Sequence, residues 1–208
     1  MSSETANHSR TAQAARELLI DTQLPQFQAR SFYAVVVDAP PEAAYRAVRD
    51  LDPRQVAQAV PAMQLMGWVR ALPARISARH RQDSAPETLP ADQAEQAFVP
   101  VADTPGTEFV VAMIGKFSSP TELEFRRFDP GEFAGFTEPG YGKVAVSFLV
   151  VPYGNSRALL CTETRTATTD PHTARRFQRY WQIIHPFAGY IMRRWLALAK
   201  QHAEQAAS

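Results

Sequence analysis

The chain has 208 residues, of which 45% are apolar and 21% are charged, as in an ordinary globular protein. Its formal net charge of +1 gives no electrostatic basis for binding nucleic acid or an anionic membrane. The single cysteine, Cys161, excludes an internal disulfide framework and suits a reducing compartment. The N-terminus lacks the apolar core of a signal peptide, and the longest apolar stretch near the end is about half the roughly 20 residues that span a bilayer. We therefore expect a cytoplasmic protein without stable membrane insertion.

The N-terminal part of the chain predicts one strand flanked by short helices. Residues 1–10 are polar and are expected to be disordered, and a short helix that stops before Pro25 follows them. Residues 31–39, SFYAVVVDA, are rich in β-branched and aromatic side chains and predict a strand. The next helix has Asp38 as its expected cap and prolines at its first positions. Its short apolar face consists of Ala44, Tyr45 and Val48.

The middle of the chain predicts a polar excursion and then a sheet. Residues 80–95 are polar and contain two prolines, so we expect weak order there and a lid if a pocket lies beneath. Strand-like runs joined by short turn signals follow, which implies an antiparallel sheet. Helices that are separate from the strands along the chain imply the α+β class. The predicted strands are QAFVPVA, TEFVVAMIGKF, ELEFRRF, GEFAGFT, YGKVAVSFLVV and SRALLCTETRTAT.

The C-terminal part predicts one long amphipathic helix. Asp170 is its expected cap, and Pro171 occupies the first position, where a missing N–H costs nothing. About 30 residues of helix would be about 45 Å long, so Pro186 predicts a kink that lets the helix follow a curved sheet. The apolar stripe of this helix consists of Phe177, Tyr180, Trp181, Ile184, Ala188, Ile191, Met192, Trp195 and Leu198.

Several segments carry a resemblance: LPQFQARSFYAVVVDAPPEAAYRAV, MIGKF, EPGYGKVAVSF, TETRTATTD and RRFQRYWQIIHPFAGYIMRRWLALAK. With the order of elements, they resemble a bacterial branch, without an assigned activity, of the superfamily of START lipid-transfer domains and polyketide cyclases/dehydrases. The resemblance implies a helix-grip fold, in which a curved antiparallel sheet wraps around a long kinked C-terminal helix. We expect a partly disordered extension (1–23), a single helix-grip domain (24–203) and a tail (204–208). The scaffold hosts carriers, enzymes and binding proteins, so it does not fix a chemistry.

Alternation along two predicted strands indicates which side chains face the long helix. These side chains form either a solid core or the wall of a partly hollow core that holds an apolar ligand, as the resemblance implies. Polar residues such as Lys143 and Ser147 would lie on the other face. The candidate ligand-binding residues of the helix-facing side are Phe109, Val111, Met113, Phe117, Val144, Val146 and Phe148.

The long helix adds Trp181, Ile184 and His185 as candidate ligand-binding residues. Trp181 and its neighbour Tyr180 belong either to the core or to a ligand platform. His185 is either a pocket acid or base, or it satisfies carbonyl groups that the kink at Pro186 frees. The arginines of this helix are most simply a solvated face.

The face of the sheet on which Glu163 and Arg165 lie depends on the length of one loop. A two- or four-residue loop after the strand 141–151 would place both side chains on the face toward the helix, where they would form the polar hook of an apolar pocket. A three- or five-residue loop would reverse this and make them an ion pair on the outer face. We adopt the inward placement as the prediction.

The sequence predicts a protein that binds or transfers a small apolar or aromatic molecule or a lipid in a cavity between sheet and C-terminal helix. The alternative is a cyclase- or dehydratase-type enzyme acting on a bound polyketide-like or lipid-like substrate, and we lean against an enzyme because few ionisable side chains are available. A second alternative is an interaction protein with a filled core, docking a protein partner through residues 80–95. No phosphate loop, metal-ligand spacing or nucleophile motif is visible, so we expect no cofactor and no metal.

Overall fold

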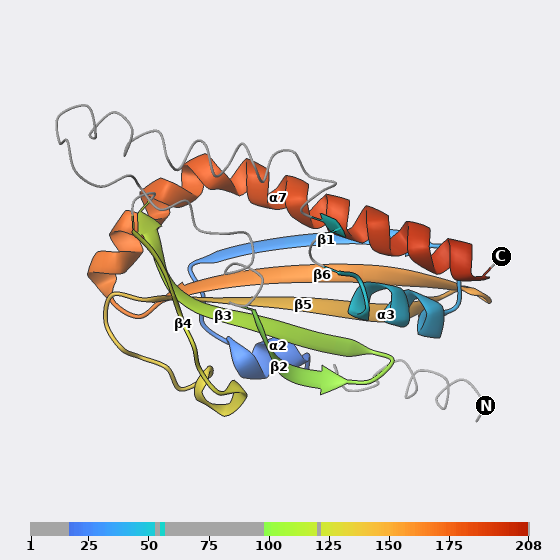
Figure 1. Ribbon diagram of the computed structural model, residues 1–208, viewed down its shortest axis with the longest axis horizontal. Coiled ribbons are helices and arrows are strands. Elements are labelled where there is room, and N and C mark those ends of the chain that lie inside the picture. The colour runs from blue at the N-terminus through green and yellow to red at the C-terminus, as the bar shows by residue number, and fades with distance from the viewer. Residues whose placement is uncertain (1–16, 53–54, 57–97, 120–121, 208) are drawn as a thin grey trace, which may run out of the picture.

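The computed structural model describes residues 17–52, 55–56, 98–119 and 122–207, and it has the predicted α+β architecture. An antiparallel sheet lies against one long C-terminal helix (Figure 1). The elements in chain order are α2 (Leu19–Gln23), β1 (Ala29–Val37), α3 (Pro41–Arg49), β2 (Val99–Thr104), β3 (Glu108–Ser119), β4 (Glu122–Arg126), the 3₁₀ helix η1 (Pro130–Glu132), β5 (Gly142–Tyr153), β6 (Arg157–Thr168) and α7 (Pro171–Ala207).

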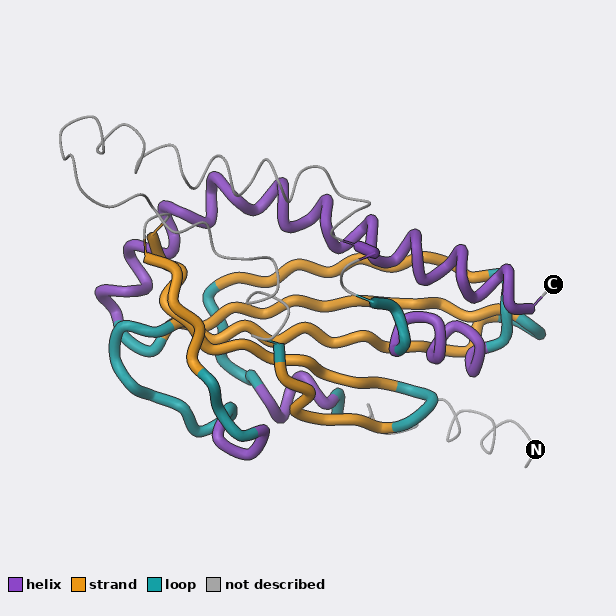
Figure 2. The backbone as a smooth tube through the Cα atoms, in the orientation of Figure 1, coloured by secondary structure: helices purple, strands orange, loops and turns teal. Residues whose placement is uncertain are grey.

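The sheet has the strand order β1-β6-β5-β3-β2, and β4 pairs with β3. Helices α7 and α3 cover one face, which we call the inner face, and α2 lies against the opposite, outer face (Figures 1 and 2). At the beginning of α7, β3 and β4 bend toward the helix (Figure 1). The predicted combination of an antiparallel sheet with a long C-terminal helix is therefore confirmed.

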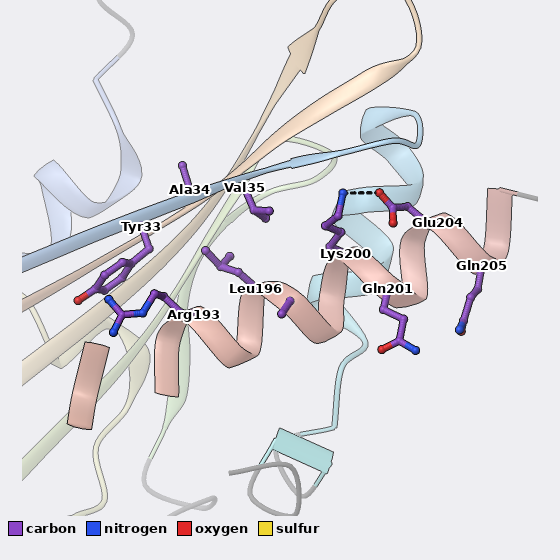
Figure 3. A pocket seen from close by; sticks show the side chains of 10 residues that line it. Tyr33, Ala34, Val35, Arg193, Leu196, Lys200, Gln201, Glu204 and Gln205 are labelled. Atoms are coloured by element: carbon purple, nitrogen blue, oxygen red, sulfur yellow. Dashed lines mark hydrogen bonds and ion pairs between the residues drawn. The ribbon is translucent and has the colours of Figure 1, made fainter. Parts of the chain in front are cut away.

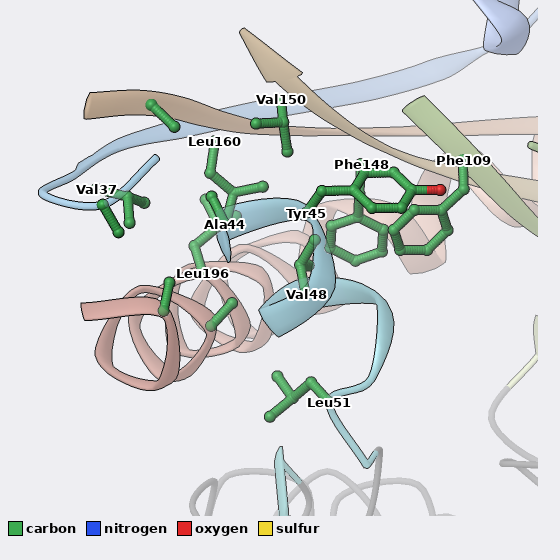
Figure 4. Packing of buried hydrophobic residues seen from close by; sticks show 14 of the residues in the cluster. Val37, Ala44, Tyr45, Val48, Leu51, Phe109, Phe148, Val150, Leu160 and Leu196 are labelled. Atoms are coloured by element: carbon green, nitrogen blue, oxygen red, sulfur yellow. The ribbon is translucent and has the colours of Figure 1, made fainter. Parts of the chain in front are cut away.

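The inner core is aromatic at its centre and aliphatic toward the end of α7. The rings of Phe109 and Phe148 stack with centroids 5.1 Å apart, and the ring of Tyr45 from α3 meets Phe109 edge-on at 5.9 Å (Figure 4). Leu160 from β6 and Leu196 from α7 belong to the same buried cluster. The apolar face predicted for α3 is buried in this cluster, so α3 is held by packing despite its short length.

The β5–β6 hairpin has a three-residue loop. Tyr153 pairs with Arg157, so residues 154–156 connect the strands, and Gly154 has a φ of 69° that favours glycine. Phe148 consequently lies opposite Thr162, an even-numbered residue. The two- or four-residue loop expected from the sequence is wrong, and with it the predicted facing of every residue of β6.

Helix α7 begins as predicted and, with 37 residues, is longer than the 30 or so expected from the sequence. Asp170 caps it, because its Oδ1 accepts hydrogen bonds from the backbone N–H groups of His172 and Thr173, both at 2.9 Å. The helix then runs through Pro186 to Ala207 without a break. Its axis nevertheless changes direction along its length (Figures 1 and 2), as a proline within a helix favours.

Two other local predictions are wrong. Residues 131–137, predicted as a strand, form the end of η1 and a loop, and Phe133 of this segment is buried against the outer face. Asp38 does not cap α3, because Pro40 occupies the cap position without a side-chain hydrogen bond. The backbone N–H of Asp38 instead donates to Oε1 of Glu204 at 2.8 Å. The predicted lid, residues 80–95, lies outside the described residues.

Candidate functional site

A row of threonines runs along the inner face of β6. In the sequence TETRTAT, the threonines alternate with Glu163, Arg165 and Ala167, so one strand presents hydroxyl groups to one face only. The register places the first three threonines opposite Phe148, Val146 and Val144, which all pack in the inner cluster. The members of the row are Thr162, Thr164, Thr166 and Thr168.

The hydroxyl groups of this row are short of hydrogen-bond partners. Oγ1 of Thr162, Thr164 and Thr168 is buried and has no partner among the described residues. The indole Nε1 of Trp195 on α7 is also buried without a partner, and the Trp195 ring lies 5.6 Å from the ring of Phe148. A buried hydroxyl or N–H group without a partner costs about 1–3 kcal/mol. These groups therefore have unused hydrogen-bonding capacity, which a bound molecule would reach by displacing the side chains that cover them.

The middle of the inner face is only half-buried. At one end of this face, Phe148 and Leu160 pack against Trp195 and Leu196 of α7. At the other end, a separate cluster joins Ala29 to Phe177. Between these clusters the side chains are half-buried rather than buried, and Val144 packs against both clusters. The half-buried side chains are Ser31, Val111, Met113, Val144 and Thr164.

Tyr33 on the edge strand β1 marks the border of this region. It lies level with Thr162, and its ring is so close to α7 that a Cβ at Gly189 would overlap the phenol oxygen. The guanidinium carbon of Arg193 lies 5.1 Å from the centre of the Tyr33 ring. Gly189 is thus the position that allows α7 to approach the edge of the sheet.

Beyond Tyr33, an open groove of about 630 Å³ lies between β1 and the last part of α7 (Figure 3). Its floor is apolar, and Lys200 at its rim donates hydrogen bonds to the carbonyl of Val36 and to Glu204. None of the site residues predicted from the sequence lines this groove. Its lining residues are Tyr33, Ala34, Val35, Arg193, Leu196, Ala197, Lys200, Gln201, Glu204 and Gln205.

The apolar candidates on the sheet lie on the inner face, as predicted. Phe109, Val146 and Phe148 are buried in the cluster under α7, whereas Met113 packs near Phe177. Val111 and Val144 are half-buried on the same face. Phe117 belongs to β3, but its side chain is outside the description. Ligand binding by these residues stays a prediction.

The helical candidates differ in burial. Trp181 and Ile184 are half-buried, and the ring of Trp181 lies 5.6 Å from that of Phe177. His185 is exposed, with its ring 5.3 Å from that of Trp181. A histidine that is exposed to solvent lacks the burial by which a pocket shifts the pKa of a catalytic acid or base. Trp181 and Ile184 therefore remain the candidates on this part of α7.

Glu163 and Arg165 face away from α7, which corrects the prediction of an inward polar hook. The three-residue loop sends both to the outer face, where their side chains are 7% and 8% exposed. Nε of Arg165 donates to Oε1 of Glu163 at 2.7 Å, and Arg30 on β1 donates to both oxygens of Glu163 at 2.8 Å. Burial alone would raise the pKa of Glu163, but the hydrogen bonds from these two arginines lower it below its usual value.

This outer charge network anchors helix α2. Nη2 of Arg165 pairs with Asp21 at 2.6 Å, and Nη1 donates to the carbonyl of Leu24 at 3.1 Å, just after the helix. At the other end of α2, the N–H groups of Leu19 and Ile20 donate to Glu108. An acid at the first turn and a base at the last carbonyls both complement the helix dipole. Glu163 and Arg165 thus have a structural role that their positions in the sequence did not reveal.

The described inner face offers little for acid–base chemistry. The buried charged residues of the described chain are Glu108, Lys143, Glu163 and Arg165, and all of them project from the outer face. Burial lowers the pKa of Lys143, whose ammonium group donates to the carbonyl of Ala134 at 2.8 Å. On the inner side, burial and the hydrogen bond to Asp103 raise the pKa of Tyr45 to about 12. A phenol with that pKa is a poor proton donor at neutral pH.

In the described ranges, no three His, Cys, Asp or Glu side chains come together in a way that would hold a metal ion. None of the helices within these ranges combines the length and the apolarity needed to cross a membrane.

Comparison with known proteins gives distant structural similarity. No family model and no curated protein matches the chain. A conserved protein from Geobacillus kaustophilus is 9% identical, with 86% of this chain and 98% of that chain covered and a TM-score of 0.43. Norcoclaurine synthase from Thalictrum flavum is 14% identical, with 88% and 90% covered and a TM-score of 0.31. The di-domain ARO/CYC BexL from the BE-7585A biosynthetic pathway is 14% identical, with 85% and 47% covered and a TM-score of 0.31. Similarity at this level carries no functional argument, so function has to be argued from this chain's own residues.

Proposed function

We propose that this protein binds a small, largely apolar molecule between the inner face of the sheet and α7. The observation that carries the proposal is the set of buried, unpartnered groups on this face, the hydroxyls of Thr162, Thr164 and Thr168 and the indole N–H of Trp195. Buried polar groups in proteins are nearly always hydrogen-bonded, so such a set is expected where a ligand completes it.

The apolar surroundings of these groups support the same proposal. Val144, Val111 and Met113 are half-buried side chains of the middle strands, and Trp181 and Ile184 of α7 are half-buried as well. Aliphatic and aromatic walls with a few polar groups are typical of sites for small molecules. The ligand would therefore bury apolar surface against both layers and direct its polar atoms at β6.

An enzyme of the cyclase or dehydratase kind is less well supported. Such an enzyme needs a positioned group that moves protons, and the described inner face has no buried carboxylate, lysine or histidine. The interaction role through residues 80–95 concerns a segment outside the described residues. Deletion of that segment would support the interaction role only if partner capture were lost while ligand binding persisted.

The proposal is tested by filling the space with a side chain. Val144→Trp adds a large ring to the half-buried middle of the inner face, whereas Val151→Trp adds the same ring at an exposed position of the same strand. Binding is measured by the fluorescence of Nile red, a neutral dye, and by mass spectrometry of an organic extract of the purified protein. We expect Val144→Trp to weaken dye binding at least tenfold and Val151→Trp to leave it unchanged.

The folded state of each variant is checked by circular dichroism and thermal unfolding. If Val144→Trp does not fold, Met113→Phe is a smaller change at a half-buried position of the neighbouring strand. The proposal fails if wild-type protein binds neither the dye nor any extractable compound. It also fails if both inner-face variants fold and bind as the wild type does.

A further inference from the structure

We infer that the ligand of this site is electrically neutral and carries hydroxyl or carbonyl oxygens along its length. This inference rests on the proposed function and adds the chemical class of the molecule. It comes from what β6 presents to α7, which is a series of hydroxyl groups without a charged side chain among them.

The absence of buried charge on the described inner face selects against ionic ligands. Every buried charged residue of the described chain lies on the outer face, where Glu163 and Arg165 are already paired with each other. The arginines on this side, Arg49 over the ring of Phe109 and Arg193 over that of Tyr33, are exposed. A carboxylate or phosphate buried under α7 would therefore lose its hydration without meeting a buried cation among the described residues, which is strongly unfavourable. An ammonium group buried there would equally meet no buried carboxylate, because Asp103 beside Tyr45 is 36% exposed. A fatty acid or a phospholipid headgroup is therefore a poor match, whereas an alcohol, a ketone or an ester is a good one.

The hydroxyl groups of the row can each donate and accept a hydrogen bond. They therefore match both hydroxyl and carbonyl oxygens, and the indole N–H of Trp195 adds a donor that selects for an acceptor. Adjacent members of the row are two residues apart on one strand, which corresponds to a spacing of about 6.6 Å. From Thr162 to Thr168 the row extends for about 20 Å, so it suits an elongated molecule with several oxygens better than a compact molecule with one.

Matched probes separate charge from chain length. Displacement of Nile red is measured with decan-1-ol, decane-1,10-diol and decanoate at pH 8, where decanoate is ionised. We expect decanol to displace the dye at a concentration at least tenfold lower than decanoate. The diol should displace it at a still lower concentration, because its second hydroxyl reaches another member of the row.

A conservative variant tests the row itself. Thr164→Val exchanges one unpartnered hydroxyl for a methyl group of similar size. Thr22→Val makes the same exchange at an exposed position on α2, where the hydroxyl donates to the carbonyl of Leu19 at 2.7 Å. We expect Thr164→Val to weaken decanol binding three- to tenfold. The Tm of the free protein should stay the same or rise, because a buried hydroxyl without a partner has been removed. Thr22→Val should leave decanol binding unchanged.

The possible results are distinct. If neither the dye nor any of the probes binds, the proposed function itself is wrong. If the dye binds but decanoate competes as well as decanol, the neutral-ligand inference is overturned while the binding function stands. A fall in the Tm of Thr164→Val with unchanged decanol binding would also overturn it, because the hydroxyl would then serve the fold alone.

Discussion

Replacement of Arg165 by methionine should destabilise the protein without affecting the inner face. Methionine retains an apolar side chain but removes the guanidinium group that contacts Glu163, Asp21 and the carbonyl of Leu24. Breaking a buried ion pair typically costs about 3–5 kcal/mol. Here Arg30 still neutralises Glu163, so we expect the lower part of that range, about 3 kcal/mol. For a chain of this size that corresponds to a fall in Tm of about 6–12 °C.

Arg30→Met is the matched control, because it removes the other arginine from the same carboxylate. The side chain of Arg30 is 53% exposed, so its loss should cost no more than about 1 kcal/mol. Free energies of unfolding are measured by urea titration at pH 7, and Nile red binding is measured for both variants. Equal destabilisation by the two substitutions would refute the assignment of Arg165 as the buried anchor of α2. Loss of dye binding in Arg165→Met, with the fold retained, would refute its placement on the outer face.

Three further predictions concern other parts of the fold. Gly189→Ala should destabilise by about 1–3 kcal/mol although alanine favours helices, and Tyr33→Phe in the same chain should recover part of that loss. Folding lowers the pKa of Glu163, so the ionised carboxylate stabilises the folded protein fully above about pH 4.5, and this contribution is lost as the pH falls through the folded pKa. The free energy of unfolding should therefore fall more on acidification in the wild type than in Glu163→Gln. Asp170→Ala should cost about 1–2 kcal/mol by thermal unfolding and Asp170→Asn much less, because asparagine also caps helices.

The long elements were predictable because their patterns are redundant. Helix α7 carries an apolar stripe over many turns, and its start has two independent signals in Asp170 and Pro171. In β3 and β5, strict alternation identified the inner face correctly at Phe109 and Phe148. An error at one position of such a pattern would not have changed the predicted element or the face assigned to it.

The facing of β6 was not predictable, because it depends on a single residue in a loop. The sequence PYGN favours a two-residue turn at Gly154-Asn155, but the structure closes the hairpin with residues 154–156. The strand itself gives no correction, since TETRTAT has polar residues at every position but one and either face would be acceptable by hydropathy. Because the loop has one residue more than the two-residue turn, β6 presents a row of hydroxyl groups to α7 instead of the predicted Glu163 and Arg165.

The role of α2 was also hidden from the sequence. A helix of five residues is too short for periodicity to be informative, and it is not stable by itself. Its anchors come from distant strands, with Glu108 on β3 and Arg165 on β6. Ion pairs between residues so far apart along the chain have no local signature, so only the assembled sheet reveals them.

The facing of β6 connects the stability of the fold to the selectivity of the proposed site. A strand that alternates charged and hydroxyl side chains must present one kind to each layer. Of the charged kind, Arg165 meets Asp21 and the carbonyl of Leu24 at the short helix α2, and Glu163 is paired with Arg165 and Arg30. The hydroxyl kind meets α7, whose backbone groups are already bonded within the helix, so Thr162 and Thr164 keep free hydrogen-bonding capacity. The same alternation that directs Arg165 toward α2 on the outer face thus leaves β6 without a charged side chain on the inner face, as the proposed neutral ligand requires.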